Sequence, residues 1–279
     1  MKKITLREFV TLLVQKSKED NIADYAYRMT YSLLLSFFPF AAFLLSLISM
    51  ADLDYTLLMT FSEAFLPKEV YRLIHENVTQ TEKELRTQFM SYSALFALYA
   101  ASGGFRAFME GADRVTNSQK KRKAFMKYVL SVIWVVLFSF AIVSALLGIV
   151  FGQKILNKIK EHLPALPGEE LLNLFRILLP LVFVFILFLS INMFVPSRQI
   201  CFSCALPGSV FVTALWTIAT LLFGFYVNRF TDYSRFYGTV GSVIILLVWL
   251  QLTSVILLLG MEVNDIFMDK GIIKPKEPK

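Results

Sequence analysis

The sequence has 279 residues, of which 56% are hydrophobic, 15% aromatic and only 18% charged. An average soluble domain carries about a quarter charged residues, so this chain has too few charges to cover a water-exposed surface. The composition argues against a secreted disulfide scaffold, a disordered tail and an ordinary cytosolic enzyme. It predicts an integral membrane protein.

Six runs without Asp, Glu, Lys or Arg are long enough to cross a bilayer, whose core of ~30 Å needs about 20 apolar helical residues. Helices satisfy their own backbone hydrogen bonds in lipid. We therefore predict an all-α integral membrane protein with six transmembrane helices in one polytopic domain, residues 1–279. We expect the first run to be a span rather than a cleaved signal sequence. The runs are 29–51, 87–105, 128–153, 177–197, 199–228 and 236–261.

The basic residues are distributed unevenly between the two sets of connections. Of the 28 Lys and Arg, 18 fall on the set that includes both termini and 10 on the opposite set. The positive-inside rule then predicts both termini in the cytoplasm. The net charge of +7 gathers on this inner face, where anionic headgroups of membrane lipids are the expected partner and nucleic acid is not.

The segments outside the runs also carry helical patterns. Residues 1–28 alternate apolar and charged positions, which predicts a cytoplasmic helix lying in the membrane interface. Residues 52–86 repeat apolar side chains at helical spacing around Pro67, which predicts an outer cap of two short helices. Residues 262–279 form the expected cytoplasmic tail, whose last part, 274–279, we expect to be disordered.

Proline and glycine interrupt three of the runs. A membrane helix that begins at Pro207, with 199–206 as a re-entrant or interfacial lead-in, fits the long fifth run. Interrupted segments often line transport sites, but neighbouring helices can equally absorb a kink. The interruptions are Pro39 in the first run, Gly103 and Gly104 at the end of the second, and Pro207 and Gly208 in the fifth.

Polar side chains in or beside the runs have two readings. They serve as hydrogen-bonded contacts between helices, or they line a path through the bundle. The arginines among them either anchor the inner face or engage a phosphate group. The candidate path-lining or hinge residues, besides the interruptions, are Arg106, Asn192, Arg198, Tyr226, Tyr237, Gly238, Gly241, Gln251, Glu262 and Asn264.

Signals for catalysis are weak. Cys201 and Cys204 form a CxxC without a second pair for zinc, so their role stays open. His75 and His162 fall on predicted outer connections and lack the spacing of metal ligands. We therefore expect no enzyme, no catalytic residue, no cofactor and no metal.

Several blocks together resemble the YihY/BrkB family of bacterial inner-membrane proteins. They include the first span, 26–39, and the closing third, in which Tyr237-Gly238-Thr239-Val240-Gly241-Ser242 and Gly260-Met261-Glu262-Val263-Asn264 are the most specific. The match is looser at 111–114, where members usually carry an Ala-Leu-Asn-Arg-like segment. The resemblance implies six spans, both termini inside and a bacterial inner-membrane location. It implies no settled activity, and the older family label of ribonuclease BN looks like a misassignment.

The leading hypothesis is a translocator for a lipid or an amphiphilic, envelope-related solute. It predicts a cavity that reaches Pro39, Gly104, Pro207 and Gln251. The alternative is a membrane scaffold that binds envelope proteins through residues 52–86. A ribonuclease is a further alternative and requires inward-facing metal ligands. The sequence leaves open whether the chain forms an oligomer.

Overall fold

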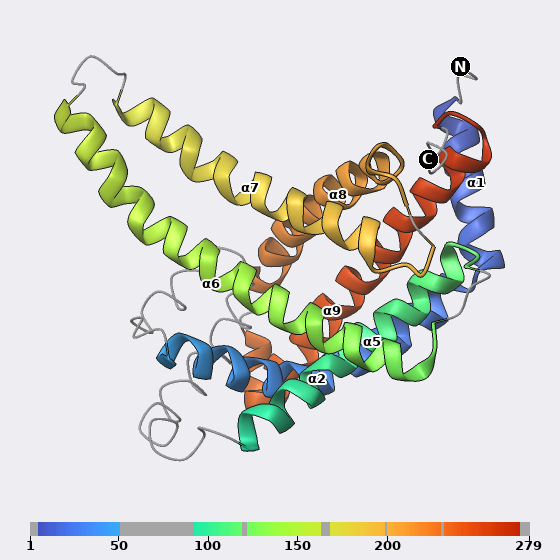
Figure 1. Cartoon of the computed structure of the whole chain (residues 1–279), viewed down its shortest axis with the longest axis horizontal. Helices are drawn as coiled ribbons and strands as arrows, with labels where there is room; N and C mark the ends of the chain where they lie inside the picture. The colour runs from blue at the N-terminus through green and yellow to red at the C-terminus, as the bar shows by residue number, and fades with distance from the viewer. Residues whose placement is uncertain are drawn as a thin grey trace.

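The computed structural model describes residues 5–50, 92–118, 122–162, 168–198, 200–229 and 232–273. This part of the chain contains seven helices and no strand, which confirms an all-helical architecture (Figure 1). The helices are α1 (Leu6–Glu19), α2 (Ile22–Met50), α5 (Tyr92–Val115), α6 (Ala124–His162), α7 (Gly168–Phe194), α8 (Phe202–Arg229) and α9 (Asp232–Asp269).

Helix α9 is the centre of the packing. It contacts α8 and α2 along much of its length, and α5 and α1 more locally. The amphipathic α1 lies against the last turns of α9, so both ends of the described chain meet at one end of the bundle, which we call the α1 end (Figure 1). Helix α6 packs on α5 and α7 packs on α8, while the ends of α6 and α7 nearest their connection project away from the other helices with little contact between them (Figure 1).

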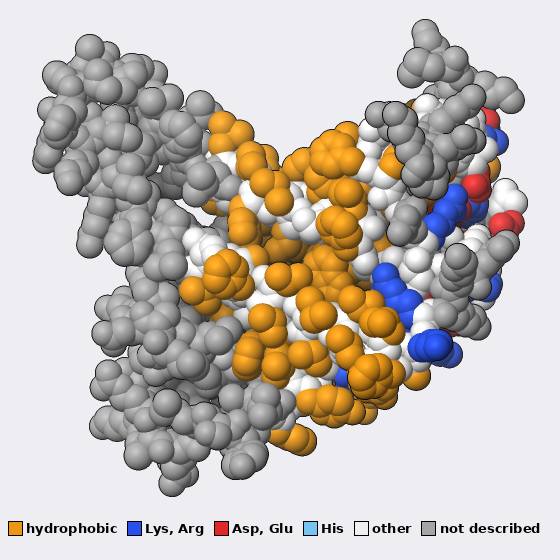
Figure 2. Space-filling model, viewed as in Figure 1, with side chains coloured by type: hydrophobic (Ala, Val, Ile, Leu, Met, Phe, Trp, Pro, Cys, Tyr) orange, Lys and Arg blue, Asp and Glu red, His pale blue; other side chains and the backbone are white. Residues whose placement is uncertain are grey.

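The apolar helices are suited to lipid. Three described segments are long and apolar enough to cross a membrane, namely Ala124–Ser144, Phe202–Val227 and Val240–Asp269, and a shorter apolar stretch covers Pro180–Phe194. Apolar side chains cover the middle of the face shown in Figure 2, while Lys, Arg, Asp and Glu gather at the α1 end. The chain is thus a helical membrane protein, and its six-span topology stays a prediction. The expected cap, 52–86, and the last residues, 274–279, lie outside the described residues.

The proposed start of the fifth span at Pro207 is wrong. Helix α8 begins at Phe202 and runs through Pro207, so 199–206 is not a separate lead-in. A proline in the second turn removes only the bond to the Ser203 carbonyl. Ser203 is exposed, so its carbonyl can bond to the surroundings.

The glycines of the second run do not end a helix either. Helix α5 continues through Gly103 and Gly104 to Val115 because α2 packs there. A Cβ on Gly104 would lie 2.6 Å from Leu33 Cδ2, and the Gly104 amide donates to Ser36 Oγ at 3.0 Å. Tertiary contact therefore outweighs the low helix propensity of the glycine pair. Helix α2 likewise continues through Pro39.

Helices α8 and α9 meet backbone to backbone at a pair of glycines. A Cβ built on Gly208 would lie 2.0 Å from the Gly260 carbonyl oxygen, and one built on Gly260 would lie 2.0 Å from Val212 Cγ2. Membrane helices associate closely through small residues of this kind. No side chain larger than hydrogen fits at either position without moving the helices apart.

We predict that Gly208→Ala and Gly260→Ala each lower the thermal midpoint of the detergent-solubilised protein, by an overpacking cost of about 1–3 kcal/mol. Gly224→Ala on the same α8 is the matched control. Nothing lies within 4 Å of its added Cβ, so that variant should be unchanged or gain up to about 1 kcal/mol from helix propensity. Equal midpoints for all three variants in a circular-dichroism melt would contradict the glycine contact.

Candidate functional site

Polar side chains, more than half of them buried, gather at the α1 end of the bundle, just beyond the contact between Gly208 and Gly260. They come from α1, α7 and α9 and from the segment that follows α7. Buried polar groups in a membrane protein need partners, so the site is defined by how these side chains pair. We call this group the terminal polar cluster; it consists of Lys16, Asn192, Arg198, Glu262, Asn264, Asp265 and Asp269.

An amide network joins α7, α8 and α9. The Gly208 amide donates to Asn264 Oδ1 at 2.7 Å, and Asn264 Nδ2 donates to Asn192 Oδ1 at 2.9 Å. Asn192 Nδ2 in turn donates to the Phe188 carbonyl at 2.9 Å. Both asparagine side chains are fully buried. Asn264 therefore links the α8 backbone to α7.

Glu262 lies two residues after Gly260 on α9, within one helical turn of the glycine contact, and is fully buried, at 0% exposure. Among the described residues, neither of its carboxylate oxygens accepts a hydrogen bond. Its charged neighbour is Lys16, whose Nζ lies 4.0 Å from Glu262 Oε1. A buried carboxyl group without hydrogen-bond partners is costly, which makes Glu262 the least satisfied ionisable group of the cluster.

Lys16, which lies on α1, contacts three carboxylates of α9. Its ammonium donates to Asp265 Oδ2 and, at 2.8 Å, to Asp269 Oδ2, in addition to the longer contact with Glu262. Burial lowers the pKa of Lys16, but the hydrogen bonds and charges of Asp265 and Asp269 outweigh burial and raise the pKa above its ordinary value. Arg198 Nη1 adds a contact of 3.3 Å to Asp265 Oδ1. The lysine therefore stays charged and fixes α1 to the end of α9.

A second set of contacts supports the segment after α7. Asp113 accepts the Ser197 amide at 2.7 Å and the Ser197 hydroxyl at 2.8 Å. Arg122 donates to the carbonyls of Val195 and Pro196, each at 2.8 Å. These contacts could not be predicted from the sequence, because Asp113 and Arg122 lie more than 70 positions from their partners and no local sequence pattern indicates the pairing.

The turn between α1 and α2 is also held by charge. Burial raises the pKa of Asp20 above its ordinary value, and the nearby Arg114, with Nε 3.6 Å from Asp20 Oδ1, opposes this rise. Asn21 follows in the left-handed region with φ of 53°, a conformation that asparagine tolerates. The junction places α1 at the angle at which Lys16 meets α9.

A groove of about 190 Å³ separates α1 from the end of α9 beside the terminal polar cluster. At this groove, Lys16 and Asp269 of the terminal polar cluster reach the surface of the protein. Its lining combines apolar and charged side chains: Leu12, Gln15, Lys16, Glu19, Ile266, Asp269 and Lys270.

The polar residues midway along the spans pair with one another. Thr30 Oγ1 donates to Gln251 Oε1 at 2.7 Å and lies 3.1 Å from Ser254 Oγ, joining α2 to α9. This geometry matches the helix-contact reading of Gln251 rather than the lining of a path.

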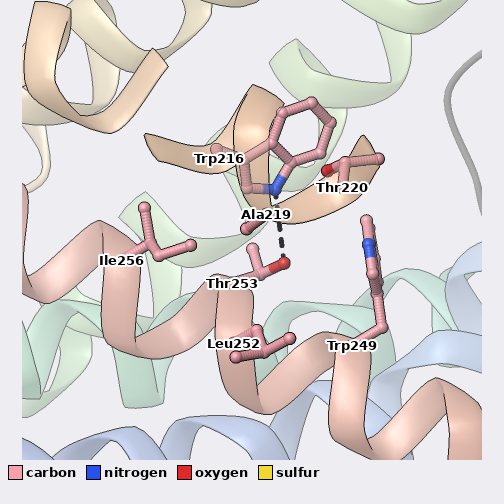
Figure 3. A pocket seen from close by; sticks show the side chains of 7 residues that line it. All are labelled: Trp216, Ala219, Thr220, Trp249, Leu252, Thr253 and Ile256. Carbon is pink, nitrogen blue, oxygen red and sulfur yellow. Dashed lines mark hydrogen bonds between the residues drawn. The ribbon is translucent and has the colours of Figure 1, made fainter. Parts of the chain in front are cut away.

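A shallow dent with no room for a water molecule lies between α8 and α9, further along the same helices (Figure 3). Trp216 Nε1 donates to Thr253 Oγ1 at 3.3 Å across it, and the ring centroids of Trp216 and Trp249 are 6.2 Å apart. Neither this dent nor the groove beside α1 is lined by Pro39, Gly104, Pro207 or Gln251. The structure thus does not place these four residues around either space.

The remaining candidates are dispersed. Arg106 lies on α5 beside α6, and the half-buried Pro39 lies on α2. Tyr226 is exposed on α8, and Gly241 is buried on α9. Tyr237 and Gly238 are part of α9, and their side-chain surroundings lie outside the described residues.

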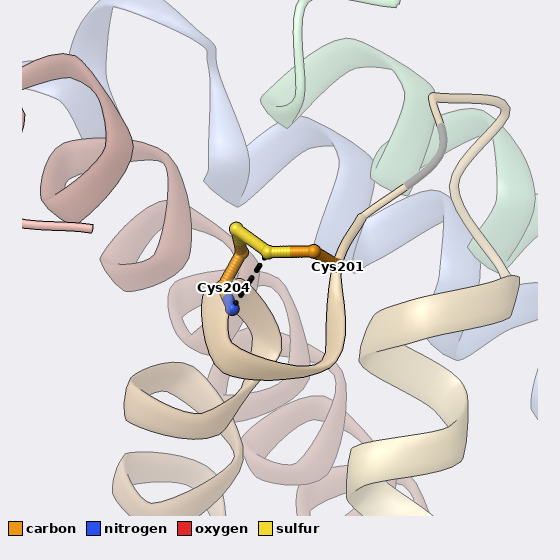
Figure 4. Close-up of a disulfide and its surroundings, with 2 residues drawn as sticks. All are labelled: Cys201 and Cys204. Atoms are coloured by element: carbon orange, nitrogen blue, oxygen red, sulfur yellow. Dashed lines mark hydrogen bonds between the residues drawn. A yellow bond between two sulfur atoms is a disulfide. The ribbon is translucent and has the colours of Figure 1, made fainter. Parts of the chain in front are cut away.

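Cys201 and Cys204 form a disulfide at the start of α8 (Figure 4). Cys204 is fully buried, and its backbone amide donates to Cys201 Sγ at 3.2 Å. The pair, whose role the sequence left open, closes the first turn of α8 ahead of Pro207. It thereby stiffens the helix start that carries Gly208.

We predict that Asn264→Ala lowers the free energy of unfolding by about 1–3 kcal/mol, because it leaves the buried Gly208 amide and Asn192 Oδ1 unpaired. The loss in Asn192→Ala/Asn264→Ala should be smaller than the sum of the two single losses, since the residues share one bond. Thermal melts in detergent give the comparison. Ser190→Ala, which removes only a bond to the Ile186 carbonyl of its own helix, should leave stability nearly unchanged; additive losses at Asn192 and Asn264 would refute the network.

Comparison with known proteins covers nearly the whole chain. The family model described as virulence factor BrkB matches residues 13–277. The ribonuclease-like protein YfkH of Bacillus subtilis (strain 168) is 27% identical over 254 residues, which are 90% of this chain and 91% of YfkH. A UPF0761 membrane protein of Vibrio atlanticus (strain LGP32) is 26% identical over 268 residues, 92% of this chain and 81% of the relative.

No solved structure matches the chain. The family model alone spans far more than half of the sequence and includes every residue of the terminal polar cluster. The chain is therefore a membrane protein of the BrkB virulence factor family.

Proposed function

We propose that this protein moves a lipid or another amphiphilic solute across the bacterial inner membrane, and that Glu262 contacts the polar part of that solute. The observation that carries the proposal is the environment of Glu262. Its carboxylate is fully buried at the end of an apolar span, lacks a hydrogen-bond donor among the described residues, and faces one ammonium 4.0 Å away.

The energetics favour a functional reading of this residue. Ionisable side chains within membrane segments are expensive, and those that persist often lie on substrate or ion pathways. A structural ion pair would be expected to fill the remaining hydrogen-bonding capacity of the carboxylate. The Asn264 amide shows that this end of α9 can form a saturated network, so the unsatisfied Glu262 beside it is better explained by a transient partner.

The geometry also supports a contact that can open. Lys16 belongs to α1, which packs on the outside of α9 and joins α2 through a short turn. Moving α1 would therefore uncover Glu262 and widen the groove at Leu12 and Ile266 without breaking the packing of α8 on α9. An amphiphile fits such an opening because its head meets the carboxylates while its tail stays beside apolar helices.

The proposed role is not enzymatic. Among the residues that the structure describes, no group of three His, Cys, Asp or Glu side chains is placed to hold a metal ion. A nuclease would have to cleave RNA when the purified protein is given magnesium or zinc. A scaffold would instead yield a stoichiometric envelope protein on purification and leave lipid exchange unchanged.

We predict that the protein reconstituted in phosphatidylglycerol and phosphatidylethanolamine vesicles speeds the exchange of fluorescent phospholipid between leaflets. Dithionite quenching of the outer-leaflet label measures this exchange. Glu262→Gln removes the acidic group that faces Lys16 and should slow the exchange at least about tenfold, as expected for loss of the proposed contact with the polar part of the solute.

Glu110→Gln is the matched control, since Glu110 is an exposed carboxylate on α5 outside the cluster. It should exchange lipid like the unmodified protein. Exchange no faster than in protein-free vesicles, with labelled lipids of either headgroup, would overturn lipid translocation. Equal rates for Glu262→Gln and the unmodified protein would remove Glu262 from the mechanism.

A further inference from the structure

Arg106 lies beside a stacked pair of tyrosine rings, within cation–π distance of both. Its guanidinium carbon lies 5.1 Å from the ring centroid of Tyr99 and 4.8 Å from that of Tyr128. The two rings are stacked, with centroids 6.2 Å apart and planes 10° from parallel. Tyr99 is 52% exposed and Tyr128 44% exposed, so α5 and α6 present the charge at their outer face.

The guanidinium has donors to spare. Arg106 Nη1 donates to Ser102 Oγ, and the Ser102 hydroxyl donates a hydrogen bond to the Tyr99 carbonyl at 2.6 Å. Among the described residues, no carboxylate lies within ion-pairing distance of Arg106. Since arginine stays charged under all physiological conditions, its guanidinium is available to an anion from outside this part of the chain.

The position along the helices suits the headgroup region of a bilayer. Arg106 lies nine residues, ~13 Å, before the end of α5 at Val115. Tyr128 lies about 6 Å into α6, at the end where the charged side chains gather. Tyrosine is enriched at this depth of a membrane, and an arginine side chain reaches toward it.

The local sequence shapes the pocket around the guanidinium. A Cβ on Gly103 would lie 3.4 Å from Arg106 Nη2 and 3.0 Å from Ser36 Oγ. The glycine therefore leaves room for the arginine to lie flat against α5. Phe96, three residues before Tyr99 and 72% exposed, continues the same face with an apolar surface for an acyl chain.

We propose that Arg106, Tyr99 and Tyr128 form a binding site for the phosphate group of a membrane phospholipid. The planar guanidinium pairs with two phosphate oxygens, the tyrosine rings fix its orientation, and Phe96 contacts the lipid tail. The site does not depend on the proposed translocation, because binding at Arg106 can be measured without transport.

Native mass spectrometry of the detergent-purified protein, titrated with dioleoyl phosphatidylglycerol, tests the site. The unmodified protein should retain one lipid more than Arg106→Gln, whose apparent affinity for that lipid should fall at least about tenfold after loss of a charge-assisted pair. Dioleoylglycerol, which has the same tails and no phosphate, should bind both proteins alike. Arg106→Lys, which keeps the charge without the planar donors, should lie between them.

Arg28→Gln is the matched control, since Arg28 lies over the ring of Tyr25 alone, at 5.5 Å, rather than beside a stacked pair. It should retain phosphatidylglycerol fully. Tyr128→Leu provides a second variant in case Arg106→Gln does not fold, and it should weaken binding in the same direction. The site is refuted if Arg106→Gln binds phosphatidylglycerol as the unmodified protein does, if dioleoylglycerol fills the same site, or if millimolar inorganic phosphate displaces the lipid.

Discussion

The close contact of α8 and α9 at Gly208 and Gly260 determines the rest of the structure. Lipid provides little hydrophobic drive between helices, so close packing and hydrogen bonds must hold them together. Because no side chain separates the two backbones there, the Asn264 amide reaches both the α8 backbone and Asn192 on α7. One contact thus orders three helices and places Glu262 inside the bundle.

The charged residues are concentrated at one end of the bundle (Figure 2). Midway along the spans, Thr30 of α2 and Gln251 of α9 form a hydrogen bond, and neither side chain is charged. At the α1 end, charges are tolerated because they pair: Asp265 with both Lys16 and Arg198, and Asp20 with Arg114. Glu262 shares one property with each set: it is buried like the neutral groups midway along the spans, and ionisable like the charged groups at the α1 end.

The sequence predicted the parts of the fold that depend on local composition. The runs free of charge mark the bodies of α6, α8 and α9, and the block around Gly260, Glu262 and Asn264 supplies the centre of the terminal polar cluster. Long-range contacts could not be read in this way, because Lys16 meets Asp265 across 249 positions. Pro207 was misplaced as a helix start because a proline in the second turn of α8 removes only the bond to the carbonyl of the exposed Ser203, so the helix can begin before it.

Lys16 and Arg106, two of the cations near the membrane border, differ in where their counter-charges come from. Lys16 is surrounded by Glu262, Asp265 and Asp269, so its charge is balanced within the chain and serves to hold α1. Arg106 contacts two aromatic rings and donates to a hydroxyl, none of which carries negative charge. A charge at the edge of an apolar layer must be neutralised or hydrated, and the densest source of anions at that depth is the phosphate layer of the membrane. The internal ion pairs therefore hold α1 to the end of α9, whereas we propose that Arg106 binds the phosphate group of a lipid.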